Sequence, residues 1–143
     1  MKKSLKSILS VSIAISTVMT GRAQNASWQQ SSEWTLYNIK GAKFYKIKPD
    51  SLDTYYHRLL NDDSIRGFLS DAKPITSDKP PMWMGACVAS CLINGKRHKI
   101  DISSYGGFFF DETERKYYTV AEGVRRDWLN YFAESAGSIP FKR

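Results

Sequence analysis

The chain has 143 residues, with 21 Lys and Arg side chains against 14 Asp and Glu side chains, and a formal net charge of +7. This length suits one domain. Two cysteines in the whole chain are too few for a scaffold held together by disulfides.

The first 23 residues have the features of an export signal. Three lysines within the first six residues precede an apolar stretch over residues 8–19, which is shorter than the ~20 residues that a membrane-spanning helix needs. Gly21 and Ala23 put small residues where signal peptidase reads the chain, so we expect cleavage after Ala23. A short, lysine-led signal followed by Gln24 is typical of Gram-negative bacteria. It predicts a periplasmic or secreted protein with no membrane insertion after cleavage.

Cleavage would also change the charge balance. The signal holds Lys2, Lys3, Lys6 and Arg22 and no acid, so 17 of the 21 basic residues remain against 14 acidic ones, a net charge of +3. That excess is too small to favour nucleic acid as a partner. The only local run of lysines, over residues 40–48, is interrupted by aromatic and aliphatic residues and is typical of a solvated strand at a sheet edge.

The first half of the expected domain predicts strands and then a helix. Residues 24–32 are polar and indicate a flexible leader, and residues 33–48 predict a strand pair or one bent strand broken at Gly41. Pro49 to Ser51 predicts a helix start and residues 61–63 its end, because apolar residues recur at three- and four-residue spacing between them. A further short helical turn is expected over residues 64–69, and residues 73–81, with three prolines, indicate a crossover loop.

The stretch over residues 82–120 predicts an antiparallel meander. Neither set of alternating residues in the run from Trp83 to Ile93 is charged, so we expect this strand to be covered on both faces or to be central in the sheet. Asn94-Gly95 is the favoured two-residue hairpin turn and would pair Cys91 with His98. On the return strand, apolar positions alternate with polar ones, which predicts one inner and one outer face. The polar residues that are expected on the outer face are Arg97, Lys99, Asp101 and Ser103.

A second helix is expected to follow this meander. Thr119 and Glu122 have the spacing of a capping box, and the apolar stripe continues to about Glu134, with Gly137 as the stop. The order of elements predicts one α+β domain over residues 24–143. We expect an antiparallel meander sheet of about four or five strands, with two main helices packed on one face.

The two thiols are the first catalytic candidates. Four residues of a regular strand span ~13 Å, whereas a disulfide requires Cα atoms within ~7 Å. Cys87 and Cys91 are therefore expected to be free. A thiol nucleophile needs a nearby base, and His98 would supply one. This is the alternative function, a thiol-dependent hydrolase or redox enzyme that uses Cys87 or Cys91 with His98. No metal or cofactor is predicted, because the two histidines and two cysteines lack the spacing of ligand motifs.

The segment from Tyr105 to Arg115 is the candidate binding site. An aromatic residue, two glycines and an acidic tip are expected together at one end of the sheet, where binding loops tend to lie. The acidic tip would fit the basic catalytic cleft of a partner. The predicted partner-binding residues are Tyr105, Asp111, Glu112, Glu114 and Arg115.

Together these observations predict a small periplasmic or secreted, non-catalytic protein-binding module. Its most concrete form is an inhibitor or immunity protein that neutralises a periplasm-acting toxin or cell-wall hydrolase. A small-ligand carrier would need a cavity between sheet and helices, and the many aromatic residues indicate that this space is filled.

Overall fold

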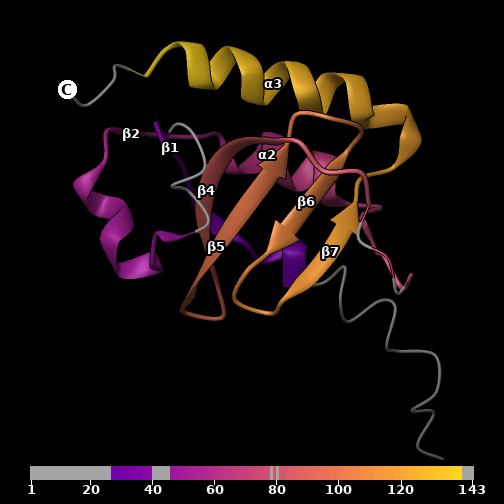
Figure 1. Cartoon of the computed structure of the whole chain (residues 1–143), viewed down its shortest axis with the longest axis horizontal. Helices are drawn as coiled ribbons and strands as arrows, with labels where there is room; N and C mark the ends of the chain where they lie inside the picture. Colours follow the sequence, from indigo (N-terminus) through magenta and orange to yellow (C-terminus); the bar gives the residue numbers. More distant parts are fainter. Residues whose placement is uncertain (1–26, 40–45, 78, 80, 140–143) are drawn as a thin grey trace, which may run out of the picture.

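The computed structural model describes residues 27–39, 46–77, 79 and 81–139. The expected export signal and residues 40–45 of the lysine run lie outside this part of the chain. The described residues form one antiparallel sheet with helices packed against it (Figure 1). Among them, no helix combines the length and hydrophobicity that crossing a lipid bilayer requires.

The sheet has seven strands in the order β2-β1-β4-β5-β6-β7-β3, and every neighbouring pair is antiparallel. The strands are β1 (Ser32–Tyr37), β2 (His57–Leu59), β3 (Lys73–Pro74), β4 (Gly85–Ile93), β5 (Lys96–Ser103), β6 (Phe108–Asp111) and β7 (Lys116–Thr119). The helices are α2 (Asp62–Leu69) and α3 (Arg125–Gly137), with 3₁₀ turns η2 (Pro49–Thr54) and η3 (Glu122–Val124). The α+β class is confirmed, and the predicted number of strands was too low.

The β4–β5 hairpin has the predicted register. Asn94 and Gly95 adopt positive φ values of 52° and 75°, as the two-residue turn requires. Ile93 pairs with Lys96, and Cys91 pairs with His98. Because side chains alternate along a strand, this register decides which residues of both strands face the helices.

One face of the sheet forms the main core with α2 and α3. Trp34 from β1, Ile100 from β5 and Phe109 from β6 are completely buried there. They pack with Ile65 and Leu69 of α2 and with Trp128 and Phe132 of α3. The aromatic side chains meet largely edge to face, as at Trp28 and Phe109, whose ring centroids are 5.3 Å apart. Trp28 is 3% exposed, so the prediction that residues 24–32 are a flexible leader is wrong at this position.

The opposite face of β5 is also buried, and the predicted alternation of inner and outer residues is wrong. Lys99, Asp101 and Ser103 have no exposed surface. The Lys99 Nζ atom lies 2.5 Å from Glu112 Oε2 and 3.5 Å from Asp101 Oδ1. The buried Lys99 charge is therefore accommodated by its ion pair with Glu112 and not by solvent, because buried charges are stable only when they are paired. Burial, a hydrogen bond with Glu112 and the charge of Glu112 raise the pKa of Asp101 to about 8, although the Lys99 ammonium acts in the opposite direction.

The helix predicted from Pro49 is a second error. The chain forms only the 3₁₀ turn η2 and then the edge strand β2. Leu52 enters a small second core with Tyr37 and Val88, while Leu59 is 73% exposed. The helical spacing of apolar residues is coincidental here, because these side chains do not share one buried face. Residues 57–59 pair with β1 as the strand β2, and this pairing prevails over the helical spacing.

The helix boundaries also differ from the predictions. Asn61, expected at the end of a helix, is the N-cap of α2, and its side chain accepts a bond from the Ser64 backbone N–H over 2.9 Å. The capping box is absent, because Thr119 donates to the Val120 carbonyl and a 3₁₀ turn precedes α3 without a side-chain cap. Part of the crossover loop forms the two-residue strand β3 on β7. The helical turn over residues 64–69 and the end of α3 at Gly137 are confirmed.

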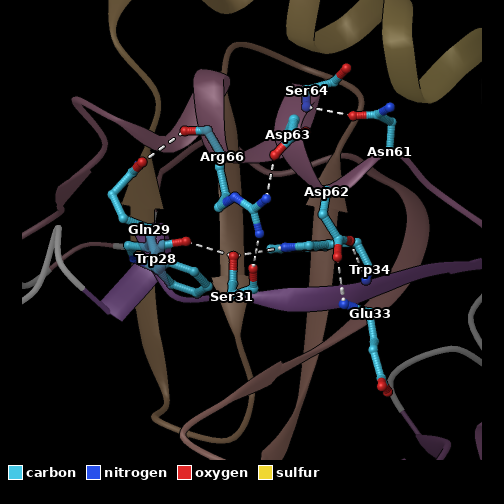
Figure 2. A network of polar contacts seen from close by, with 10 residues as sticks. All are labelled: Trp28, Gln29, Ser31, Glu33, Trp34, Asn61, Asp62, Asp63, Ser64 and Arg66. Carbon is cyan, nitrogen blue, oxygen red and sulfur yellow. Dashed lines mark hydrogen bonds and ion pairs between the residues drawn. The ribbon is translucent and has the colours of Figure 1, made fainter.

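A polar network fastens α2 to the start of β1 (Figure 2). β1 contains a register shift between Ser32 and Thr35, where Glu33 has a φ of 52°. The two backbone N–H groups that this irregularity frees, at Glu33 and Trp34, both donate to the Asp62 carboxylate over 2.9 Å. One side chain of α2 thus satisfies the donors that the sheet leaves unpaired.

We predict that Asp62→Asn lowers the free energy of unfolding by about 1–3 kcal/mol, because the amide NH₂ that replaces one of the two accepting oxygens is a donor and leaves one backbone N–H without its acceptor. Urea unfolding monitored by tryptophan fluorescence measures the change. Asp63→Asn is the matched control, since Asp63 lies in the same helical turn, pairs only with Arg66 in the described residues and has an 89% exposed side chain. Its cost should stay below about 1 kcal/mol. Equal effects of the two substitutions would contradict the role given to Asp62.

The raised pKa of Asp101 predicts a pH-dependent stability. In the unfolded chain this carboxyl ionises near its ordinary value of 3.8, whereas in the folded protein it keeps its proton up to about pH 8. As the pH rises, the unfolded state therefore loses this proton before the folded state does. The stability that the protonated Asp101 gives the folded protein is lost as the pH rises from about 4 to about 8.

Asp101→Asn should flatten this part of the stability curve, which urea unfolding at a series of pH values would show. The same substitution at the exposed turn residue Asp71 serves as the control, because it leaves the buried cluster intact. A wild-type stability that rises steadily over this pH range, unchanged by Asp101→Asn, would contradict the assignment.

A candidate polar pocket at the hairpin end of the sheet

The β4–β5 and β6–β7 turns lie at the same end of the sheet (Figure 1). Between them is an open pocket with a volume of about 400 Å³. Its floor and walls include Trp28, His98, Asp111 and Tyr118, and exposed charged side chains stand at its rim. The rim residues are Lys96, Glu114 and Lys116.

The floor of the pocket is a histidine–carboxylate pair. His98 Nδ1 lies 2.8 Å from Asp111 Oδ2, and these residues are 5% and 1% exposed. The other carboxylate oxygen, Oδ1, accepts bonds from the backbone N–H groups of Thr113 and Glu114 over 2.9 and 3.2 Å. An ionised carboxylate can only accept, so Nδ1 carries a proton in this arrangement. The pair fixes the orientation of the imidazole ring and closes the β6–β7 turn.

Tyr118 stands beside this pair on β7. Burial raises the pKa of its hydroxyl, and the carboxylates of Asp111 and Glu114 raise it further. The phenol therefore stays neutral and offers a hydrogen-bond donor at the pocket wall.

Cys91 is not among the residues that line this pocket. It is paired with His98 across the hairpin, but it is 1% exposed, and no hydrogen bond joins the two side chains in the described structure. Burial raises the pKa of its thiol far above the ordinary value, and the charges of Asp111 and Asp62 add to this shift. The thiolate that nucleophilic catalysis needs is thus disfavoured.

Cys87 is a second buried thiol, distant in register from His98. It lines a separate pocket of about 290 Å³ together with Ile102, Leu129 and Phe132, between the sheet and α3. Burial raises the pKa of Cys87 to about 12. Both cysteines are free, as the strand geometry predicted.

The structure separates the five residues that were expected to form one binding site. Asp111 points inward to His98, and Glu112 pairs with the buried Lys99. Glu114 and Arg115 are exposed at the β6–β7 turn. Tyr105 precedes β6 and therefore lies at the opposite end of that strand. The expectation that all five share one end of the sheet is wrong, because a complete strand lies between them.

Tyr105 is instead one of the large exposed apolar side chains of the described residues, as are Met82 and Met84. These side chains are 50%, 69% and 58% exposed. The Ser104 backbone N–H donates to the Met84 carbonyl over 2.7 Å, which holds the two segments side by side.

Sequence reasoning missed the lysines and aromatic residues of the pocket. Lys96 directly follows the hairpin turn, and Lys116 is the cross-strand partner of Asp111. The register of both hairpins was the signal that could have identified these two. Trp28 had no such signal, because it reaches the pocket from outside the sheet.

Within the described residues, no group of three or more His, Cys, Asp or Glu side chains is arranged to hold a metal ion. No protein family model matches the chain, and comparisons with curated proteins and with solved structures give no significant match.

We predict that neither thiol reacts readily in the folded protein. Ellman's reagent at pH 8 should modify Cys87 and Cys91 only after unfolding in urea, because burial keeps both thiols protonated and inaccessible. Absorbance under native and denaturing conditions measures this difference. Rapid labelling of Cys91 in the native state, mapped by mass spectrometry, would instead show an accessible nucleophile.

Proposed function

We propose that this chain is a small periplasmic or secreted, non-catalytic module that binds another protein. The observation that carries the proposal is the state of the charged side chains around the hairpin-end pocket. Lys96, Glu114 and Lys116 line it and are exposed, and none of them forms an ion pair within the described residues. The polar groups of the floor, in contrast, already satisfy one another. The rim is free to contact a partner.

The rigidity of this site also favours protein binding. Both turns are held at strand ends, so the backbone that carries the rim side chains is positioned before a partner arrives. A pocket of this kind can accept one anchoring side chain of a partner. The proposed export places the module where toxins and cell-wall hydrolases act, and an inhibitor or immunity protein against such an enzyme is the form of the function we favour.

The alternative is a thiol-dependent enzyme. The observation in its favour is that Cys91 is the cross-strand neighbour of His98, whose imidazole ring is in turn bonded to Asp111. A thiol enzyme uses such a nucleophile, base and orienting carboxylate. This function would require Cys91 to leave the core and lose its proton. The substitution Cys91→Ala separates the two proposals, since a binding module would keep its partner and a thiol enzyme would lose its activity.

We expect the protein in a periplasmic extract to begin at Gln24, which intact mass spectrometry would establish. An affinity-tagged mature chain should retain one protein partner in near-stoichiometric amount from the same extract. Cys91→Ala should retain the same partner. The proposal would be contradicted by a chain found only in the cytoplasm with residues 1–23 still attached, or by the absence of any enriched protein.

A further inference from the structure

The β6–β7 turn is acidic in the sequence but basic at the surface of the folded protein. Asp111 is held by His98 and by two backbone N–H groups. Glu112 is held by Lys99, 2.5 Å away. Two of the three acids in this turn are therefore engaged inside the molecule and face no partner.

The exposed charges at this end of the sheet are mostly positive. Lys96, Arg115 and Lys116 are exposed, against Glu114 alone among the acids of the two turns. Two of these cations, Lys96 and Lys116, line the same pocket from neighbouring hairpins. The rim therefore favours an anionic group over a cationic one.

We propose that the pocket accepts a carboxylate side chain from an acidic stretch of the protein partner, which Lys96 and Lys116 contact from the two hairpins. This inference rests on the proposed function and specifies the chemistry of its partner. It reverses the sequence-based expectation of an acidic tip that enters a basic cleft.

The composition of the pocket favours a carboxylate over a phosphate or another dense anion. Asp111 and Glu114 lie in the same pocket as the two lysines, and their charges oppose a second, multiply charged group. The remaining lining combines the polar residues Ser27, Asn94 and His98 with Trp28, Ile93 and Tyr118. The last three suit the methylene groups of a Glu or Asp side chain. A single negative charge on a short apolar stem matches both features.

The test is a titration of the mature protein with the capped peptide acetyl-Glu₄-amide, and separately with inorganic phosphate, monitored by ¹⁵N NMR. We expect saturable shifts of the backbone signals of Lys96, His98 and Lys116 and of the Trp28 indole with the peptide, and weaker binding of phosphate. The double variant Lys96→Gln/Lys116→Gln should weaken peptide binding roughly two- to thirty-fold, the range that two exposed ion pairs supply. The control Lys73→Gln/Lys79→Gln removes the same charge from exposed positions outside the pocket and should leave the affinity unchanged.

A third variant has the opposite sign and guards against a loss of folding in the double variant. Glu114→Gln removes the unpaired acid from the rim and should strengthen peptide binding. The proposal would be overturned by shifts that do not saturate, by phosphate binding as tight as the peptide, or by equal losses in the two lysine pairs.

Affinity purification with the tagged protein distinguishes a failure of this inference from a failure of the proposed binding function. If wild-type protein and Lys96→Gln/Lys116→Gln retain the same partner equally well, the carboxylate site is wrong and the binding function stands. If wild-type protein retains no partner although the peptide binds as expected, the binding function is wrong and the anion selectivity of the pocket stands.

Discussion

The register of the β4–β5 hairpin is the constraint on which the rest of the structure depends. Asn94 and Gly95 supply the two consecutive positive φ values that a tight two-residue turn requires. A slip by one residue would send every side chain of β5 to the opposite face. It would put His98 away from Asp111 and bring Lys99 into the aromatic core under the helices. The candidate pocket and the buried charge cluster thus both follow from one turn.

The charge cluster and the α2 network show how the fold treats polar groups that it buries. Lys99 neutralises the Glu112 carboxylate, while burial and the neighbouring Glu112 keep Asp101 protonated near neutral pH. Asp62, in contrast, completes a β-sheet irregularity by accepting the two backbone bonds that β1 leaves unpaired. In each case a side chain from one segment pairs with a polar group of another segment, which joins the sheet and the helix into one packed unit.

The two ends of the strands differ in character. The hairpin end has a polar pocket with a basic rim, and Met84 and Tyr105, which flank the other ends of β4 and β6, are exposed apolar residues. Strand β6 separates them, so a partner that covers one end need not touch the other. Cys91 lies in the core, in the same buried cluster as Trp34 and Ile93, where a thiol packs as a small apolar side chain.

The sequence by itself determined the α+β class, the hairpin turn, the pairing of Cys91 with His98 and the free state of both thiols. These properties are local or follow from strand periodicity, which the chain carries in any window of a few residues. Only the tertiary structure decided that residues 57–59 form an edge strand, that Lys99 is buried and that Asp111 points inward. Each of these depends on what packs against the segment from elsewhere in the chain, and such long-range contacts leave no periodic trace in the sequence.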